Sequence, residues 1–100
     1  MSKVDRRPCV YILASKPNGT LYVGVTSDPV RRVSEHRSDA VEGFTKKYKV
    51  HTLVHCEFHE TMEAAILREK QIKHWNRAWK LRLISAGNPE WRDLYDDLVL

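Results

Sequence analysis

The sequence predicts an α/β fold in which helices flank a small three-stranded antiparallel sheet, in the order β-β-α-β-α-α-α. Two short apolar runs, at residues 9–13 and 21–25, enclose a turn-rich segment at 16–19, and this pattern favours a β-hairpin. Helix-start signals and helical periodicity account for most of the remaining chain. The 100 residues are enough for one domain, with a core expected at about 8–86 and a helical C-terminal extension at 88–100.

The predicted hairpin brings two tyrosines together. The Pro-Asn-Gly sequence within residues 16–19 favours the backbone dihedrals of a turn. If the turn centres on its proline and asparagine, Tyr11 lies opposite Gly24. Leu13 then lies opposite Tyr22. Side chains alternate between the two faces of a strand, so both tyrosines point to the same face, diagonally across the glycine. A glycine at that place lets another group approach the sheet closely.

The middle of the chain is predicted to contain a helix, a loop and a strand. The helix begins at Pro29, which suits the first helical position, with Asp28 as its N-cap, and runs through Asp39. Residues 41–49 contain a glycine and several lysines, and we expect an exposed loop there. A third strand follows at 51–59, where alternate side chains should point to opposite faces of the sheet.

The C-terminal part is predicted to be helical. A long helix runs from 62 to about 75 and is capped by Thr61. A further helix covers 79–86. The last one runs from 89 to about 98, with Asn88 as N-cap and a proline at its first position. The chain shows no internal repeats, low-complexity segments or linkers.

Composition limits the classes of function that fit. The net charge of +4 suits a polyanionic partner, and no helix-turn-helix or zinc-finger pattern is present to read a nucleotide sequence. Cys9 and Cys56 lie in apolar runs and lack metal-binding spacing, as expected for free thiols in a reducing, cytoplasmic compartment. Residues 1–8 lack the apolar stretch of a signal peptide, and no run is long enough to span a membrane. We therefore expect a cytoplasmic protein without a membrane partner. Its oligomeric state is left open, with a monomer as the default.

One carboxylate falls on the apolar side of the long predicted helix. The apolar residues of that helix form one stripe at helical spacing: Met62, Ala65, Ile66 and Ile72. Glu69 lies near the middle of this stripe. Because burying an unpaired charge costs free energy, this carboxylate must be ion-paired, metal-bound or protonated. Two interpretations are open: a structural ion pair with an arginine, or a ligand for Mg²⁺ or Mn²⁺, which bind one or two carboxylates together with water and phosphate.

Two further residues of interest share a face of the first helix. Arg32 and His36 are four positions apart, next to the apolar stripe that contains Val33. Arg32 could hold a phosphate through two hydrogen bonds, and His36 could move protons near neutral pH. The alternative interpretation is a polar run on a solvated helix surface. A similar choice holds for a set of lysines that could follow a nucleic-acid backbone or could be ordinary surface charge: Lys46, Lys47, Lys49 and Lys73.

These residues together resemble a known family of nucleases. Cys9-Val10-Tyr11 and Tyr22-Val23-Gly24 resemble the two halves of the GIY-YIG motif, although a cysteine stands at its first glycine. Tyr11, Tyr22, Gly24, Arg32, His36 and Glu69 occur in the order and approximate spacing of the GIY-YIG endonuclease superfamily. The resemblance covers essentially the whole chain and is closest to the small bacterial single-domain branch.

The resemblance implies a GIY-YIG fold and a metal-dependent DNA endonuclease that hydrolyses phosphodiester bonds. Glu69 would bind Mg²⁺ or Mn²⁺, and Arg32 would neutralise charge on the phosphoryl oxygens. One of the two tyrosines, Tyr11 or Tyr22, would orient or deprotonate the attacking water, and His36 would assist the movement of its proton. Cleavage would be directed by DNA structure, as in repair or recombination. A non-catalytic nucleic-acid-binding module or a protein-interaction domain on the same scaffold is the alternative.

Asn88 is a candidate for the asparagine found downstream of the metal-binding glutamate in this family. Its distance along the chain from Glu69 is longer than in the better-known members. The helix-capping interpretation accounts for Asn88 equally well, so both are kept open.

Overall fold

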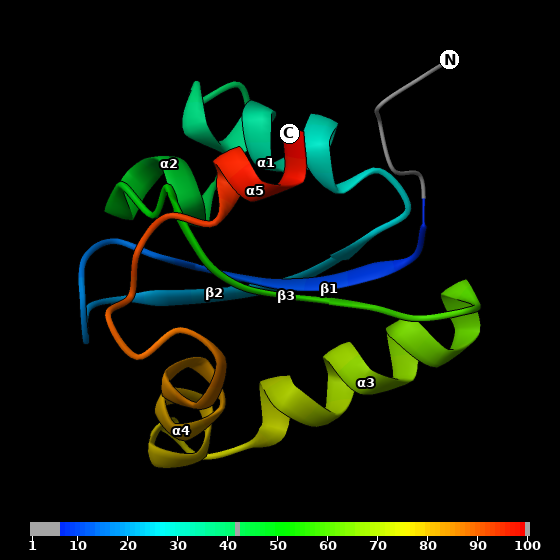
Figure 1. Ribbon diagram of the computed structural model, residues 1–100. Coiled ribbons are helices and arrows are strands. Elements are labelled where there is room, and N and C mark those ends of the chain that lie inside the picture. The colour runs from blue at the N-terminus through cyan, green and yellow to red at the C-terminus, as the bar shows by residue number, and fades with distance from the viewer. Residues whose placement is uncertain (1–6, 42, 100) are drawn as a thin grey trace.

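The structure, a computed structural model, describes residues 7–41 and 43–99. Within that part of the chain, an antiparallel sheet contains three strands, with β1 between the other two: β1 (Cys9–Ala14), β2 (Leu21–Thr26) and β3 (Thr52–Phe58). One face of the sheet is covered by α1 (Pro29–Arg37), α2 (Phe44–Tyr48) and α5 (Tyr95–Val99). The opposite face is covered by α3 (Met62–His74) and α4 (Arg77–Gly87) (Figure 1). The predicted α/β fold is confirmed, with a core between the sheet and each helical layer.

The hairpin has the predicted register. Tyr11 pairs with Gly24, and Leu13 pairs with Tyr22. The connecting turn is closed by hydrogen bonds from the Gly19 amide to the Lys16 carbonyl and from the Ser15 amide to the Thr20 carbonyl, at 2.9 and 3.0 Å. The pairing of β1 with β2 has no bulge, so side chains alternate regularly along both strands. The two tyrosines therefore lie on the same face of the sheet, the face that α1 and α2 cover.

The central strand divides the core into two layers. All six residues of β1 are buried, because β1 has a strand on each side and helices on each face. One layer lies against α3 and α4 and contains Val10, Ile12, Ala14, Val23, Val54, Ala65, Ile72, Ile84 and Trp91. The other lies on the α1 side and contains Cys9, Tyr11, Leu13, Val33, Val50 and Leu53. The alternation of β1 between these layers fixes which side chains can meet each helix.

A bulge in β3 breaks the strict alternation that the sequence predicts. Leu53 pairs with Leu13, but His55 pairs with the adjacent residue Ile12, so one extra residue lies between them. As a result, Leu53 and Cys56 share the α1 face. His55 and Glu57 point to the side of α3.

Glu57 joins β3 to α3 through a small polar network. Its carboxylate accepts hydrogen bonds from His55 Nε2 at 2.9 Å and from His59 Nε2 at 2.8 Å. Arg68, on α3, donates from Nε at 2.8 Å. These hydrogen bonds replace the ones to water that the half-buried carboxylate loses on folding.

The segment predicted as an exposed loop at 41–49 contains α2. Gly43 precedes this helix with φ of 109°, and Lys49 ends it in the left-handed conformation. The inward residue is Thr45, which is buried, and its carbonyl accepts a hydrogen bond from the Val50 amide at 2.9 Å. Five residues are too few to show helical periodicity, which explains why the sequence did not reveal this helix.

The C-terminal helices also differ from the prediction. Asn76, through its side chain, caps α4, which therefore begins at Arg77 instead of residue 79. Asn88 does not cap a following helix. It ends α4, donating its backbone amide to Ile84 at 2.8 Å, and α5 begins only at Tyr95. The chain between them turns at Trp91, whose φ is 56°.

This connecting segment takes the chain from one face of the sheet to the other. Trp91 packs in the layer beside α3 and α4, whereas Leu94 packs in the opposite layer. Leu94 also donates its backbone amide to the Leu53 carbonyl of β3, at 2.8 Å. Within the described residues, no helix has the length and apolar character needed to cross a bilayer.

Candidate active site

Three aromatic side chains meet on the α1 side of the sheet. Tyr11 on β1, Tyr22 on β2 and His36 on α1 contribute one ring each. The ring centroids are 6.3 Å apart for the two tyrosines, 5.3 Å for Tyr22 and His36, and 5.9 Å for Tyr11 and His36. Tyr11 and His36 are buried, whereas Tyr22 is partly exposed. The cluster therefore has a closed interior and an open side at Tyr22.

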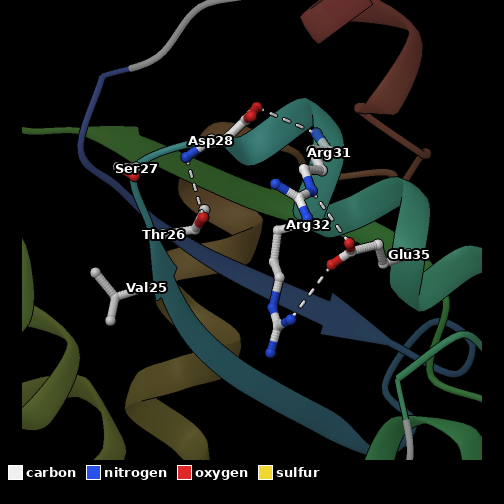
Figure 2. Close-up of a pocket in the computed structure, with 7 residues that line it drawn as sticks. All are labelled: Val25, Thr26, Ser27, Asp28, Arg31, Arg32 and Glu35. Carbon is white, nitrogen blue, oxygen red and sulfur yellow. Dashed lines mark hydrogen bonds and ion pairs between the residues drawn. The ribbon is translucent and has the colours of Figure 1, made fainter.

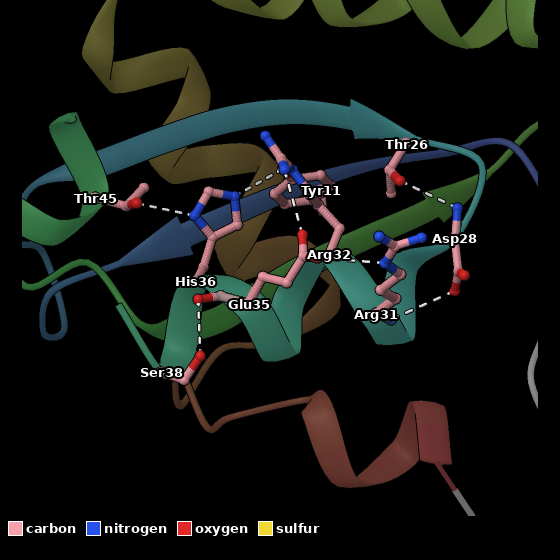
Figure 3. Close-up of polar contacts among 9 residues, drawn as sticks. All are labelled: Tyr11, Thr26, Asp28, Arg31, Arg32, Glu35, His36, Ser38 and Thr45. Atoms are coloured by element: carbon pink, nitrogen blue, oxygen red, sulfur yellow. Dashed lines mark hydrogen bonds and ion pairs between the residues drawn. The ribbon is translucent and has the colours of Figure 1, made fainter. Parts of the chain in front are cut away.

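A hydrogen-bond chain runs through the interior of this cluster. The Tyr11 hydroxyl lies 3.1 Å from His36 Nε2, and His36 Nδ1 lies 2.8 Å from Thr45 Oγ1 (Figure 3). A neutral imidazole donates at one ring nitrogen and accepts at the other, so the chain runs either from Tyr11 to Thr45 or in the reverse direction. Thr45 therefore holds the orientation of His36 and, through it, that of Tyr11.

The surroundings keep both groups uncharged at neutral pH. Burial raises the pKa of Tyr11 above its usual range, and the neighbouring Tyr22 adds to this effect, while the Arg32 guanidinium opposes it. Burial and the positive charge of Arg32 lower the pKa of His36. Tyr11 consequently keeps its proton near pH 7, and His36 is neutral there.

Arg32 lies beside this cluster, at the mouth of a polar hollow. The hollow has a volume of about 440 Å³ and lies between the end of β2 and the start of α1 (Figure 2). Glu35 holds two arginines there: its Oε1 is 3.3 Å from Arg32 Nη1 and its Oε2 is 3.2 Å from Arg31 Nε. About 40% of the Arg32 side chain is exposed, so an anion can reach it from solvent.

Glu69 lies on the helical layer that covers the opposite face of the sheet. It is buried on α3, with 9% of its surface exposed, and its Oε2 is 2.8 Å from Lys73 Nζ. Glu69 is thus paired with Lys73, one turn further along α3. The sequence interpretation had considered an arginine as the partner in this ion pair. The structure does not show Glu69 bonded to the aromatic cluster.

A second hollow connects the two sides at the edge of the sheet. It has a volume of about 320 Å³ and is lined by Leu21, Tyr22, Val23, Phe44, Lys73 and Lys80. β2 is an edge strand, so side chains from both helical layers can meet around it. Tyr22 reaches this hollow from the aromatic cluster. Lys73, the partner of Glu69, reaches it from α3.

The remaining candidates lie elsewhere. The side chain of Asn88 donates to the carbonyls of Val54 and Arg92, at 3.3 and 2.8 Å, and accepts from the Arg92 amide at 3.2 Å. Its amide group is thus used in holding the end of α4 against β3. Lys46, Lys47 and Lys49 line a separate hollow of about 500 Å³ beside α2.

Comparison with known proteins identifies the family of this chain. Residues 7–82 match the GIY-YIG catalytic domain. The chain belongs to the GIY-YIG family. Its relatives include UPF0213 proteins of Staphylococcus saprophyticus, 36% identical over 78 residues, and Natronomonas pharaonis, 44% identical over 78 residues. The matches cover 78% and 76% of this chain and 94% and 88% of the relatives.

A solved structure extends the comparison to the fold. The solution NMR structure of the UPF0213 protein from Bacillus halodurans is 30% identical, with a TM-score of 0.56, over 87% of this chain and 92% of that one. The protein described here is therefore a GIY-YIG protein of the UPF0213 type, with the α/β architecture of that group.

GIY-YIG nucleases typically use a divalent metal, and the residues of this chain fit such an ion in one way. Within residues 7–41 and 43–99, no group of three or more His, Cys, Asp or Glu side chains is placed to hold a metal. Glu69 can supply one carboxylate, and Mg²⁺ commonly binds one or two carboxylates with water and substrate phosphate. A cation there would compete with the Lys73 ammonium for the same oxygen.

Proposed function

We propose that this protein is a Mg²⁺- or Mn²⁺-dependent DNA endonuclease that hydrolyses phosphodiester bonds and selects DNA by structure. The observation that carries the proposal is the hydrogen-bonded chain from Tyr11 through His36 to Thr45, next to Tyr22 and Arg32. This chain fixes the orientation of the Tyr11 phenol and the His36 imidazole beside Tyr22, the tyrosine on the open side of the cluster. The basic net charge and the GIY-YIG match support nucleic acid as the substrate.

Each side chain has a role that follows from its surroundings. Arg32, which is reachable from solvent, would hold a phosphate oxygen once its ion pair with Glu35 is exchanged for the substrate. Tyr22, on the open side of the cluster, would face the attacking water. Tyr11 would remain protonated and donate to His36 Nε2, which leaves His36 Nδ1 to donate to Thr45. Glu69 would hold the metal, which when bound supplies Lewis-acid stabilisation of charge at the scissile phosphate.

A cleavage assay tests the proposal directly. Nicked, branched, single-stranded and plain duplex DNA would be incubated with the wild-type protein and with Arg32→Ala, each with and without Mg²⁺ or Mn²⁺. The proposal requires metal-dependent cleavage by the wild type and its loss in the variant. Arg32 lies at a helix edge, so the thermal melting of the variant should change little. No cleavage of any substrate by a folded wild type would contradict the proposal.

The ion pair between Glu69 and Lys73 favours one rival function. A carboxylate that is already neutralised needs no metal, and a scaffold of this kind could bind nucleic acid without cutting it. Under this rival, DNA binding would be salt-dependent and would not require Mg²⁺, and the wild type would leave every substrate intact. The cleavage assay above therefore separates the two.

A further inference from the structure

The outer surface of α2 carries aromatic side chains that the proposed chemistry does not use. Phe44 is 44% exposed and Tyr48 is 46% exposed, although both are large apolar groups. Their ring centroids are 4.8 Å apart, and Phe44 is 6.2 Å from Tyr22. A continuous series of rings thus leads from the buried Tyr11, through Tyr22, to the protein surface.

Basic side chains surround the exposed end of this series. Phe44 lines the hollow at the edge of β2 together with Lys73 and Lys80. Lys46 and Lys47 belong to α2, as Phe44 does, and line a separate hollow. Lysines from α3 and α4 thus lie in the same hollow as the exposed phenyl ring, and α2 itself contributes two more lysines.

We propose that Phe44 and Tyr48 form a base-stacking subsite, which receives an unpaired nucleobase next to the phosphate held at Tyr22 and Arg32. This inference rests on the proposed function, because it assigns the substrate group bound beside that site. An exposed aromatic face between cations matches the two parts of a nucleotide: the base has a π face, and its phosphates are anions. The hollow of about 320 Å³ at Phe44 lies within the usual size range of small-ligand pockets.

An unpaired base suits this surface better than a base pair does. The inner side of the Phe44 ring lies next to Tyr22, so a base can stack only on its outer side, flat against α2. A base in that position has to be out of the duplex stack. In plain duplex DNA both faces of each base are already covered by stacking. The subsite therefore favours DNA with at least one unpaired nucleotide at the cleaved position.

Binding without added metal tests the subsite separately from catalysis. Fluorescence anisotropy would measure the Kd of a labelled single-stranded oligonucleotide for the wild type, Phe44→Ala and Tyr48→Ala. Loss of one stacked base costs about 1–3 kcal/mol, so each variant should bind roughly 5- to 140-fold more weakly. The slope of log Kd against log salt should stay unchanged, since stacking releases no counterions. Lys47→Ala should instead reduce that slope by about 0.7, the value for a single-strand phosphate contact.

Trp79→Ala is the matched control. Trp79 is an exposed aromatic of similar accessibility, at 51%, but lies on α4, outside the hollow that Phe44 lines. Its loss should change Kd less than twofold. Circular dichroism of each variant would verify that α2 substitutions leave the fold intact, and Phe44→Tyr should retain binding.

The outcomes distinguish this inference from the proposed function. Weaker binding by Phe44→Ala, together with a wild type that never cleaves, would support the subsite and refute the nuclease. Cleavage by the wild type, with Kd and cleavage rate unchanged in Phe44→Ala and Tyr48→Ala, would refute the subsite alone. Equal affinity of the wild type for single-stranded and blunt duplex DNA would also contradict it.

Discussion

The ring of Tyr11 lies directly against Gly24 on the neighbouring strand. A Cβ atom added at Gly24 would lie 2.5 Å from both Cζ and the hydroxyl oxygen of Tyr11, much closer than van der Waals contact allows. The hydroxyl that bonds to His36 thus occupies the space that any other residue would fill at position 24. The glycine of the second half-motif determines where the phenol of the first can lie.

Gly24→Ala should displace the Tyr11 ring and break its hydrogen bond to His36. Overpacking of a core typically costs about 1–3 kcal/mol, so the free energy of unfolding should fall by that amount and cleavage should be lost. Urea denaturation and the cleavage assay would measure the two effects. Gly87→Ala is the control, because nothing lies within 4 Å of the added methyl group and alanine favours a helix. A Gly24→Ala protein with wild-type stability and activity would contradict this account.

Thr45→Val removes the hydroxyl that bonds to His36 Nδ1 while nearly preserving shape. A buried donor left unpaired costs about 1–3 kcal/mol, and the imidazole would lose its fixed orientation, so cleavage should drop. If Nδ1 donates to Thr45, its loss destabilises the protonated ring most, and the pKa of His36 should fall further below its ordinary value. NMR titration would follow that pKa, and Thr45→Ser should restore both properties. A higher pKa of His36 in the valine variant would show that the chain runs in the reverse direction.

Glu69→Gln should abolish metal-dependent cleavage and leave the protein folded. The stranded partner, Lys73, has about half of its side chain exposed, so it can be hydrated, and we expect a change of less than about 1 kcal/mol in the free energy of unfolding. Thermal melts and the cleavage assay on this variant provide the measurement. Glu63→Gln, at an exposed position of the same helix, serves as control. A stable Glu69→Gln protein that cuts DNA at the wild-type rate would end the metal assignment.

Acid should weaken the link between β3 and α3 at Glu57. The carboxylate is desolvated, which raises its pKa, but hydrogen bonds from His55, Arg68 and His59 outweigh burial and lower the pKa to about 2. The folded protein binds this proton less readily than the unfolded chain does. The stabilisation is therefore complete above the ordinary pKa of 4.5 and is lost as the pH falls toward 2.

The corresponding measurement is the free energy of unfolding between about pH 7 and pH 2.5. Wild type should lose on the order of 2–3 kcal/mol more than Glu57→Gln over this range. Glu60→Gln, which removes an exposed carboxylate nearby, should follow the wild-type curve. Parallel curves for the wild type and the Glu57 variant would show that this network adds nothing to stability.

Local patterns in the sequence were sufficient to predict the hairpin. The turn residues and the alternation of side chains depend only on neighbours along the chain, so the amino-acid sequence alone predicts the pairing of Tyr11 with Gly24. The helical position of Glu69 follows in the same way from a period of about 3.6 residues, and the structure buries that residue. Its partner, Lys73, is four residues away and was available from the same helical spacing.

Thr45 and the role of Asn88 could not be predicted in this way. α2 is one turn of helix whose formation depends on tertiary contacts, so its inward threonine has no periodic signature. Asn88 precedes a proline, a pattern that also fits the start of a helix. Its actual partners, Val54 and Arg92, include a strand residue far away in the sequence. Contacts of that kind appear only when the chain is folded.

The hydrogen-bonded chain from Tyr11 through His36 to Thr45 joins the most protected part of the protein to one of the least protected. Tyr11 lies on the fully buried central strand, whose amides should exchange with deuterium only when the whole protein unfolds. Thr45 lies on an isolated turn with four exposed residues out of five, whose amides can exchange through local opening. Each opening of that turn disconnects His36 from Thr45 while the sheet stays intact. The hydrogen-bonded chain can thus break and form again many times within the lifetime of one folded molecule.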